Sequence, residues 1–414
     1  MKITMLSIGS VGDVRPYIIL GKELKSRNHS VTIAVFPQFK KIVQEAGLRF
    51  FSLDGDSESM MNAIMQPDTN GISYFPRLVK NMKSHIDDLI QSMVDSCSDA
   101  DAMICNFFGT LYYSIAELNT IPCIQTHFFP MDPTGEIPMS SVRNQHLGRY
   151  GNLASYKIGY MSMSLIERYF LADWRMDHHL MKRKIATRPD YTVGDHPIPV
   201  IYAISPCVFP RPQEWSQEIH MSGFWFEKNP AAWTPSAEIE AFLENGAKPI
   251  YIGFGSMSAG DMNKLLTIVL RSVRTTGVRA VINLGKTGRK FKSNQHILFL
   301  NEVPHDWLFP RVAAVIHHGG AGTTAAGLRY GRPTLIIPFA GDQPFWGDQI
   351  RKKRCGPKPI PRKNLSVRKL AAGILDLLSN PDYAKNAADI AEALEKENGI
   401  QTAADIIEQG IASW

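Results

Sequence analysis

The sequence lacks several features that would assign the protein to a class directly. No apolar run approaches transmembrane length, and 45 basic against 39 acidic side chains give a net charge of only +6, without a long basic block. These absences disfavour an integral membrane protein and a nucleic-acid-binding protein. The five cysteines are scattered and never form a C-x-x-C pair, which argues against a disulfide framework and against a zinc cluster.

Signals for export and for a nicotinamide cofactor are also missing. Residues 1–6 run directly into a strand pattern without a cleavable small-residue site. Together with the scattered cysteines, this favours a cytoplasmic protein whose membrane contact is at most peripheral. Neither opening glycine turn has the G-x-G-x-x-G spacing, so a nicotinamide dehydrogenase is disfavoured. The oligomeric state is not indicated by the sequence.

A chain of 414 residues exceeds what one hydrophobic core usually serves, so two domains are expected. Apolar strand patterns alternate with helical patterns, which predicts an α/β fold with parallel sheets. The expected strands are 2–8, 31–35, 102–105 and 122–126, and then 249–254, 278–284, 297–300, 313–316 and 334–338. A proline-rich stretch divides the two series. We therefore predict two Rossmann-like, doubly wound domains facing each other across a cleft.

The predicted boundaries follow from these changes in composition. The domains are residues 1–210 and 236–395, joined by a linker at 211–235 and followed by a helix at 396–414. Between about 138 and 196 the strand-helix alternation stops, and long helical stretches carry aromatic residues and methionines. An adaptable apolar pocket in the first half is one interpretation. Ordinary core packing is the alternative for most of these positions.

The most informative stretch runs from Val315 to Thr324, with the sequence V-I-H-H-G-G-A-G-T-T. An apolar strand ends in two histidines and a glycine-rich turn, and a helix is expected to begin at Thr323. The glycines allow close approach to the main chain, and the helix N-terminus carries partial positive charge. Such a site suits phosphate, with further donors from His318 and the threonines. The alternative is a turn that merely ends a sheet strand.

Two further turns are expected at the same edge of the second sheet. Ser256 follows the first strand of the second series, where it could contact phosphate or cap a helix. Asp342 and Gln343 follow the last strand, and a carboxylate beside an amide can bind sugar hydroxyls, each of which both donates and accepts. Taken alone, this pair is also compatible with a hydrated loop.

Asp13 is the one acid in the opening turn of the first half, which a helix from Pro16 is expected to follow. It could take a proton from an acceptor hydroxyl, or it could cap the helix. A carboxylate beside a helix N-terminus is expected to be a weak base. The residues alone leave both roles open.

Six motifs occur in order along the chain. They are G-S-V-G-D-V-R-P at 9–16, the segment 205–226, G-F-G-S at 253–256, V-P-H-D-W-L-F at 303–309, H-H-G-G-A-G-T-T at 317–324 and G-D-Q-P-F-W-G at 341–347. Together they resemble the family 1 glycosyltransferases, above all the sterol 3-β-glucosyltransferases and the bacterial enzymes that glycosylate antibiotics. The resemblance covers nearly the whole chain, and the last two strings are highly specific.

This resemblance implies the GT-B fold, with an acceptor in the N-terminal domain, a nucleotide sugar in the C-terminal domain and the 396–414 helix packing back on the N-terminal domain. It also implies that Asp13 is the general base, with Ser10 and Gly12 in the loop near the substrates. Asp342 and Gln343 would hold sugar hydroxyls, and the segment from Val303 to His305 would lie against the nucleotide base. The diphosphate would contact Ser256, His318, Gly320, Ala321, Gly322 and Thr323.

One departure from the family pattern affects the ribose. Plant relatives place a glutamate eight residues after the loop histidine, whereas this chain has Ala326. The resemblance therefore implies ribose contacts from elsewhere. Neither a cofactor nor a metal ion is expected, because fixed donors would hold the diphosphate of the donor substrate.

The resulting hypothesis is an inverting, metal-independent transfer of glucose from UDP-glucose to a hydroxyl of an apolar acceptor, either a sterol or a lipophilic natural product. A TDP-sugar-dependent antibiotic glycosyltransferase is an alternative. A nucleotide-sugar epimerase of the same fold would need no acceptor. A non-catalytic auxiliary protein that binds a nucleotide sugar and activates a partner is a further alternative, against which the joint presence of Asp13, His318 and Asp342-Gln343 argues. Which acceptor is used is not indicated by the sequence.

Overall fold

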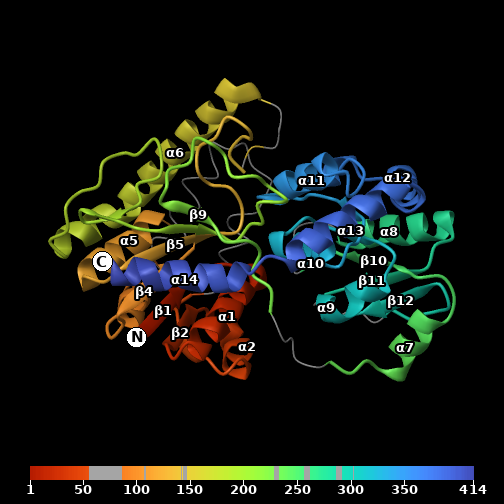
Figure 1. Cartoon of the computed structure of the whole chain (residues 1–414), viewed down its shortest axis with the longest axis horizontal. Helices are drawn as coiled ribbons and strands as arrows, with labels where there is room; N and C mark the ends of the chain where they lie inside the picture. Colours follow the sequence, from red (N-terminus) through yellow and green to blue (C-terminus); the bar gives the residue numbers. More distant parts are fainter. Residues whose placement is uncertain are drawn as a thin grey trace. The chain divides into compact units, whose positions relative to one another are not determined.

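The computed structural model describes residues 1–55, 86–106, 109–140, 142, 147–227, 233–255, 262–285, 291–301 and 303–414 (Figure 1). The chain forms two compact units. Unit 1 comprises Met1–Pro206, Pro210–Phe226 and Asn398–Trp414, and unit 2 comprises Cys207–Phe209 and Glu227–Glu397. Much of the segment expected to be a linker therefore belongs to unit 1.

Unit 1 is built around a parallel sheet. Its strands are β1 (Lys2–Leu6), β2 (Ser30–Val35), β3 (Arg49–Ser52), β4 (Ala102–Cys105), β5 (Cys123–His127), β8 (Val200–Tyr202) and β9 (Ile219–Met221). Its helices are α1 (Val11–Ser26), α2 (Lys40–Glu45), α5 (Gly109–Asn119), α6 (Gly148–Asp177) and α14 (Gly399–Ala412). The described residues also form a short antiparallel pair, β6 (Thr192–Val193) and β7 (His196–Pro197), and one 3-10 turn, η1 (Pro37–Phe39).

Within the described residues, the sheet of unit 1 has seven strands in the order β3-β2-β1-β4-β5-β8-β9. The register pairs Met5 with Ile33 on one side and with Ile104 on the other, and all three side chains are fully buried. Strands that are covered on both faces are expected to be continuously apolar, and the central strand β4 is apolar and buried along its whole length. The parallel, doubly wound fold predicted for this half is confirmed.

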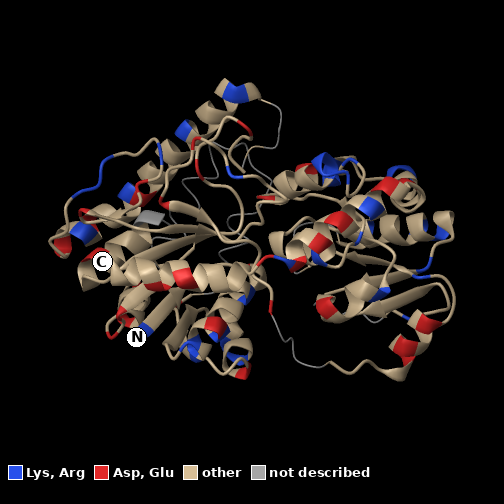
Figure 2. Ribbon diagram, viewed as in Figure 1, with Lys and Arg blue, Asp and Glu red and all other residues tan. Residues whose placement is uncertain are grey.

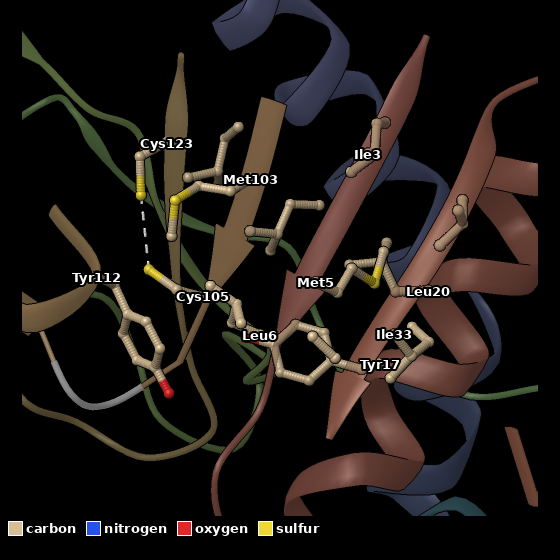
Figure 3. Packing of buried hydrophobic residues seen from close by; sticks show 14 of the residues in the cluster. Ile3, Met5, Leu6, Tyr17, Leu20, Ile33, Met103, Cys105, Tyr112 and Cys123 are labelled. Atoms are coloured by element: carbon tan, nitrogen blue, oxygen red, sulfur yellow. Dashed lines mark hydrogen bonds between the residues drawn. The ribbon is translucent and has the colours of Figure 1, made fainter. Parts of the chain in front are cut away.

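Helices bring their apolar faces onto this sheet. Tyr17 and Leu20 of α1 are fully buried against the strands, and Met103 and Cys105 of β4 pack in the same cluster (Figure 3). The C-terminal helix α14 contributes Ile407 to the cluster and packs on α1, where Arg27 forms ion pairs with two acids of α14. The end of the chain is thus an integral part of unit 1.

Helix α1 begins earlier than the sequence suggested. We expected a turn through Asp13 and a helix from Pro16, but the helix begins at Val11 and contains Pro16. That expectation was wrong because the N-terminal cap outweighs the proline. Ser10 and Asp13 form a reciprocal capping box, and Pro16 loses only one backbone hydrogen bond near the helix start.

Unit 2 contains a second parallel sheet. Its strands are β10 (Ile250–Gly253), β11 (Ala280–Asn283), β12 (Ile297–Leu300), β13 (Val315–His317) and β14 (Thr334–Ile336). Its helices are α7 (Ala237–Glu244), α8 (Met262–Thr276), α9 (His305–Leu308), α10 (Ala321–Arg329), α11 (Gln343–Lys352), α12 (Val367–Ser379) and α13 (Pro381–Glu395), with 3-10 turns η2 (Phe309–Arg311) and η3 (Arg362–Asn364).

Alternation along the strands of unit 2 supplies two cores, one on each face of the sheet. Ile250 and Ile252 of β10 join the cluster formed with α8 and α12. Tyr251, the residue between them, joins the cluster formed with α7 and α9 on the opposite face. In the part of the chain described, no helix is long and apolar enough to cross a membrane.

Candidate functional site

Each sheet has one place where the strand order reverses, and ligands of open α/β sheets bind at such places, beyond the carboxyl ends of the strands. In unit 2 the order within the described residues is β12-β11-β10-β13-β14, so the reversal lies between β10 and β13. In unit 1 it lies between β1 and β4. The predicted histidine loop follows β13, and the predicted Asp13 loop follows β1.

The imidazole of His318 lies between glycines of two neighbouring loops. A Cβ atom on Gly320 would lie 2.6 Å from His318 Nε2, and a Cβ on Gly255 would lie 3.1 Å from His318 Cε1. Gly255 also has a φ of +65°, a conformation that favours glycine. The loop after β10 and the loop after β13 therefore pack closely only because both positions lack side chains, and this packing fixes the histidine ring.

Helix α10 begins directly after this loop with an uncapped N-terminus. The helix begins at Ala321, two residues before the expected start, and its N-cap residue Gly320 offers no side-chain acceptor. The first-turn N–H groups of Ala321, Gly322 and Thr323 have no partner within the helix. A Cβ on Gly322 would meet no atom within 4 Å, so the space in front of this turn is open. Free N–H groups and the helix dipole are the features that suit a helix N-terminus to binding an anion.

Burial keeps both histidines of the loop neutral at physiological pH. It lowers the pKa of His318 to about 4 and that of His317 well below its usual range. His317 Nδ1 accepts a hydrogen bond of 3.0 Å from the Gly319 N–H, so its proton lies on Nε2. His318 Nδ1 is buried without a hydrogen bond among the described residues. The neutral His318 ring thus contributes a hydrogen-bonding group rather than a positive charge.

Asp342 and Gln343 lie at the N-terminus of α11, on the same edge of the sheet. The Gln343 side-chain oxygen accepts hydrogen bonds from the N–H groups of Phe339 and Ala340, at 2.7 and 3.2 Å. Asp342 accepts a 2.9 Å hydrogen bond from the Trp346 indole N–H. Both side chains are therefore held by their own loop and helix, and the orientation of the Gln343 amide follows from the bonds to its oxygen.

The segment from Val303 to His305 forms the start of α9. Val303 is buried in the core beside Tyr251, and the His305 ring stacks on Phe309 at 4.4 Å between centroids. His305 Nε2 lies 3.4 Å from the Tyr251 hydroxyl, which also accepts a 3.3 Å hydrogen bond from the Asn283 amide. Neither Tyr251 nor Asn283 was predicted from the sequence as a site residue. Ser256, which was predicted, lies outside the described residues.

Asp13 in unit 1 is held by the capping box at the start of α1. Its Oδ2 accepts hydrogen bonds from the Ser10 N–H at 2.7 Å and from the Ser10 hydroxyl at 3.0 Å, while the Ser10 hydroxyl accepts from the Gly12 N–H. Gly9 makes this arrangement possible, because its φ is +150° and a Cβ there would lie 2.4 Å from Asp13 Oδ2. Asp13 therefore does cap its helix, and the described residues make no hydrogen bond to its Oδ1.

Burial also changes the basicity of Asp13. Desolvation raises its pKa above the usual value, although the Ser10 hydrogen bonds act in the opposite direction. The sequence analysis expected a weak base because of the adjacent helix N-terminus. That expectation was wrong in direction, since the Gly12 N–H donates to the Ser10 hydroxyl and desolvation outweighs the hydrogen bonds that the carboxylate accepts.

Polar residues missed by the sequence analysis surround the Asp13 loop. Asn106, directly after β4, donates to the Ser7 hydroxyl at 3.2 Å and accepts from the Tyr112 hydroxyl at 3.2 Å. Ser7 in turn donates to the main-chain oxygen of Asp13 at 3.3 Å. The adjacency of β1 and β4 brings these residues together. For Asn106 the sequence signal was a polar residue directly after the predicted strand 102–105.

A second missed feature is a buried acid after β5. Asp132 accepts hydrogen bonds from the hydroxyls of Tyr202, at 2.5 Å, and Tyr191, at 2.8 Å. Burial raises its pKa to about 6. The Tyr202 hydroxyl also accepts hydrogen bonds from the N–H groups of Met131 and Asp132, and these bonds connect the loop after β5 to β8. An acid within the apolar string F-F-P-M-D-P was the sequence signal.

Two family descriptions match separate parts of the chain. Residues 3–138 match the glycosyltransferase family 28 N-terminal domain. Residues 285–408 match the C-terminal domain of proteins like erythromycin biosynthesis protein CIII. The first match includes the Asp13 loop, and the second includes the His318 loop and α11.

Relatives of known activity match over almost the whole chain. Two sterol 3-beta-glucosyltransferases of Arabidopsis thaliana are 35% and 32% identical over 97% and 98% of this chain, which covers 64% and 67% of their lengths. A sterol 3-beta-glucosyltransferase of Pichia angusta is 31% identical over 98% of this chain, which covers 33% of that protein. The chain thus spans about two thirds of the plant relatives and a third of the yeast relative.

Solved structures share the fold at low sequence identity. The glycotransferase of kitacinnamycin matches with a TM-score of 0.70 and 19% identity, covering 99% of each chain. The calicheamicin glycosyltransferase CalG4 matches with a TM-score of 0.69 and 12% identity, covering all of this chain and 98% of that one. At these identities the likeness establishes the architecture of the two α/β units and nothing finer.

Proposed function

The chain belongs to the family 1 glycosyltransferases, and from that premise we propose that it transfers glucose from UDP-glucose to a hydroxyl of a sterol or another apolar acceptor. The proposed reaction inverts the anomeric carbon and uses no metal ion. The acceptor class is suggested by the relatives named sterol 3-beta-glucosyltransferases. The observation that supports the proposal most directly is the uncapped N-terminus of α10, next to the His318 ring that lies between Gly255 and Gly320.

Donor binding is proposed for unit 2. The diphosphate would accept hydrogen bonds from the N–H groups of Ala321, Gly322 and Thr323 and approach through the open space at Gly322. Neutral His318 would add one hydrogen bond. As the bond between the sugar and UDP breaks, the leaving diphosphate gains negative charge, and these fixed donors stabilise it without reorganisation. Asp342 and Gln343 would orient the sugar through its hydroxyls.

Acceptor activation is proposed for Asp13. Its carboxylate would take the acceptor hydroxyl proton while the acceptor oxygen forms a bond to the anomeric carbon, and UDP leaves from the opposite face with the bonding electron pair. The raised pKa of Asp13 makes it a stronger base than an exposed aspartate. Because the base must be ionised, the rate should decline as the pH falls through the Asp13 pKa.

The test compares donor binding with transfer. The full chain is incubated with UDP-glucose and a panel of sterols and antibiotics, and TDP-glucose replaces UDP-glucose in a parallel series. Asp13→Asn should bind UDP-glucose as tightly as the wild type in calorimetry but lose transfer by on the order of 100-fold or more. His318→Ala should instead weaken donor binding. Both substitutions leave the sheet core unchanged.

Three results would contradict parts of this proposal. Turnover by Asp13→Asn at the wild-type rate would remove Asp13 as the base. Transfer from TDP-glucose but not from UDP-glucose would show that the donor is a TDP-sugar. Formation of an epimer from UDP-glucose without any acceptor would show that the reaction is an epimerisation.

A further inference from the structure

Exposed apolar side chains are concentrated on one part of unit 1. Among the described residues, twelve large hydrophobic side chains are exposed, and nine of them lie between positions 147 and 185. They include Tyr150, Ile158 and Met181, at 86%, 65% and 83% exposure. Scattered exposed hydrophobic residues need no explanation, but a concentration of this kind marks an interaction surface.

Five of the nine form a continuous stripe along α6, which we name the α6 stripe. It consists of Ile158, Met161, Leu165, Tyr169 and Met176. Their spacing of three, four, four and seven residues places them within roughly 80° of the helix circumference, at 100° per residue. The stripe covers about 27 Å of the helix, since each residue advances it by roughly 1.5 Å.

The opposite side of α6 already provides the contacts with unit 1. Tyr156 is buried in a small core with Met131 and Met139, and Tyr160 and Met163 pack against that core. Near its C-terminal end, Arg175 is buried and bonded to Glu117 and Ser114 of α5. None of the five stripe residues belongs to that core, and each is at least 38% exposed, so the stripe presents an apolar surface to solvent.

Positive charge borders one side of the stripe. Lys157 and Arg168 lie on the same side of the helix, beside the stripe, and both are exposed, as are Lys182, Lys184 and Arg188 after the helix. The segment after α6 lies along that side, because the Ser164 hydroxyl accepts a 3.0 Å hydrogen bond from the Ala186 N–H. Figure 2 shows Lys and Arg along this segment. We name as the basic margin Lys157, Arg168, Lys182, Lys184 and Arg188.

The basic margin is not neutralised by the protein. In the part of the chain described, none of its five residues forms an ion pair, whereas nearby Arg183 is paired with Glu117 and Asp190. The exposed acids of α6, Asp173 and Asp177, lie on the other side of the stripe by helical spacing. The exposed side chains Met181 and Ile185 alternate with the cations of the segment.

We propose that the α6 stripe and the basic margin form a docking surface for a bilayer that contains anionic phospholipid. The helix would lie in the plane of the interface, with the stripe inserted below the headgroups and the margin against lipid phosphates. Charge complementarity selects this partner, because a one-sided row of unpaired cations beside an apolar stripe matches an anionic, apolar interface. The inference goes beyond the proposed function and does not rest on it.

The experiment measures cosedimentation of the full chain with vesicles of phosphatidylcholine alone or with 30% phosphatidylserine, in the absence of any nucleotide sugar or acceptor. The stripe variant is Ile158→Gln, Met161→Gln, Leu165→Gln, and it should bind anionic vesicles on the order of 100-fold more weakly. The margin variant is Lys157→Gln, Lys182→Gln, Lys184→Gln, and it should lose roughly fivefold in affinity per charge. Added salt should weaken wild-type binding.

Matched controls come from unit 2 and from α2. Leu375→Gln with Leu378→Gln removes exposed apolar side chains of α12, at 52% and 40% exposure, and should leave binding unchanged. Lys40→Gln, Lys369→Gln, Lys385→Gln removes three exposed lysines elsewhere and should also leave it unchanged. All substitutions are at surface positions, so thermal unfolding should match the wild type.

Two results would overturn the proposal. One is wild-type binding that is absent, or that is equal for neutral and anionic vesicles and unaffected by the stripe variant. The other is a wild-type dimer in light scattering that becomes a monomer in the stripe variant, which would assign the stripe to a second copy of the chain. Since no substrate is present, either result leaves the proposed transfer reaction untouched.

Discussion

Gly322→Ala separates the stability of α10 from its proposed role in donor binding. In the structure an added Cβ at this position meets no atom within 4 Å. Alanine is also the better helix former, so the variant should be more stable than the wild type by about 0.5 kcal/mol. The same methyl group occupies the space through which the diphosphate is proposed to reach the first-turn N–H groups. Crowding of that kind costs about 1–3 kcal/mol, which raises the Kd about 5- to 150-fold.

The assay combines thermal unfolding without ligand with calorimetric titration of UDP-glucose and of UDP. Both ligands should lose affinity to a similar extent, because both carry the diphosphate. Gly320→Ala provides the contrast, since its Cβ would lie 2.6 Å from His318 Nε2 and should lower stability and affinity together. A Gly322→Ala protein that is stable and binds UDP-glucose with unchanged Kd would refute the placement of the diphosphate at this helix.

Two further predictions concern unit 1. Gly9→Ala should destabilise unit 1 by about 2–4 kcal/mol, because the added Cβ displaces the Asp13 carboxylate and strains the backbone. The variant should lose transfer but keep the wild-type Kd for UDP-glucose. Urea unfolding and turnover assays check this, and normal turnover would contradict it. Asp132 has a pKa of about 6 in the folded protein, so the native state binds more protons than the unfolded state between pH 4 and 6. The stability of the wild type relative to Asp132→Asn should therefore fall by about 3 kcal/mol as the pH rises through that window, and parallel unfolding curves for the two proteins would contradict it.

Many of the strands, and the loops at their carboxyl ends, could be predicted because the signal is local. Runs such as Ala102–Cys105 and Ile297–Leu300 are apolar and short, and they lie in the structure as predicted. Strand-helix alternation then implies parallel sheets, and the residues directly after β1 and β13 must lie at a sheet edge. The Asp13 and His318 loops follow from that reasoning without any long-range information.

Features that depend on the pairing of distant segments could not be predicted. The strand β9 lies in a proline-rich segment, whose composition argues against a strand. It nevertheless pairs with β8 at the edge of the sheet, where proline-rich segments are tolerated. The network of Asp132 with Tyr191 and Tyr202 joins residues up to 70 positions apart. The α6 stripe has helical spacing, but the sequence cannot show which of two apolar sides of that helix is covered.

The two units share a strand-loop-helix arrangement, but the helix N-terminus is capped by side chains in one unit and uncapped in the other. In unit 1 the N-terminus of α1 is capped by Ser10, which accepts from the Gly12 and Asp13 N–H groups, and desolvation raises the pKa of the Asp13 carboxyl group. In unit 2 the N-terminus of α10 has Gly320 at the cap position, so its N–H groups are left for a ligand. A capped helix start beside a desolvated acid suits the proposed proton acceptance, and an uncapped start beside a neutral histidine suits the proposed binding of a phosphate. The cap residue is thus the local difference that separates the two proposed roles.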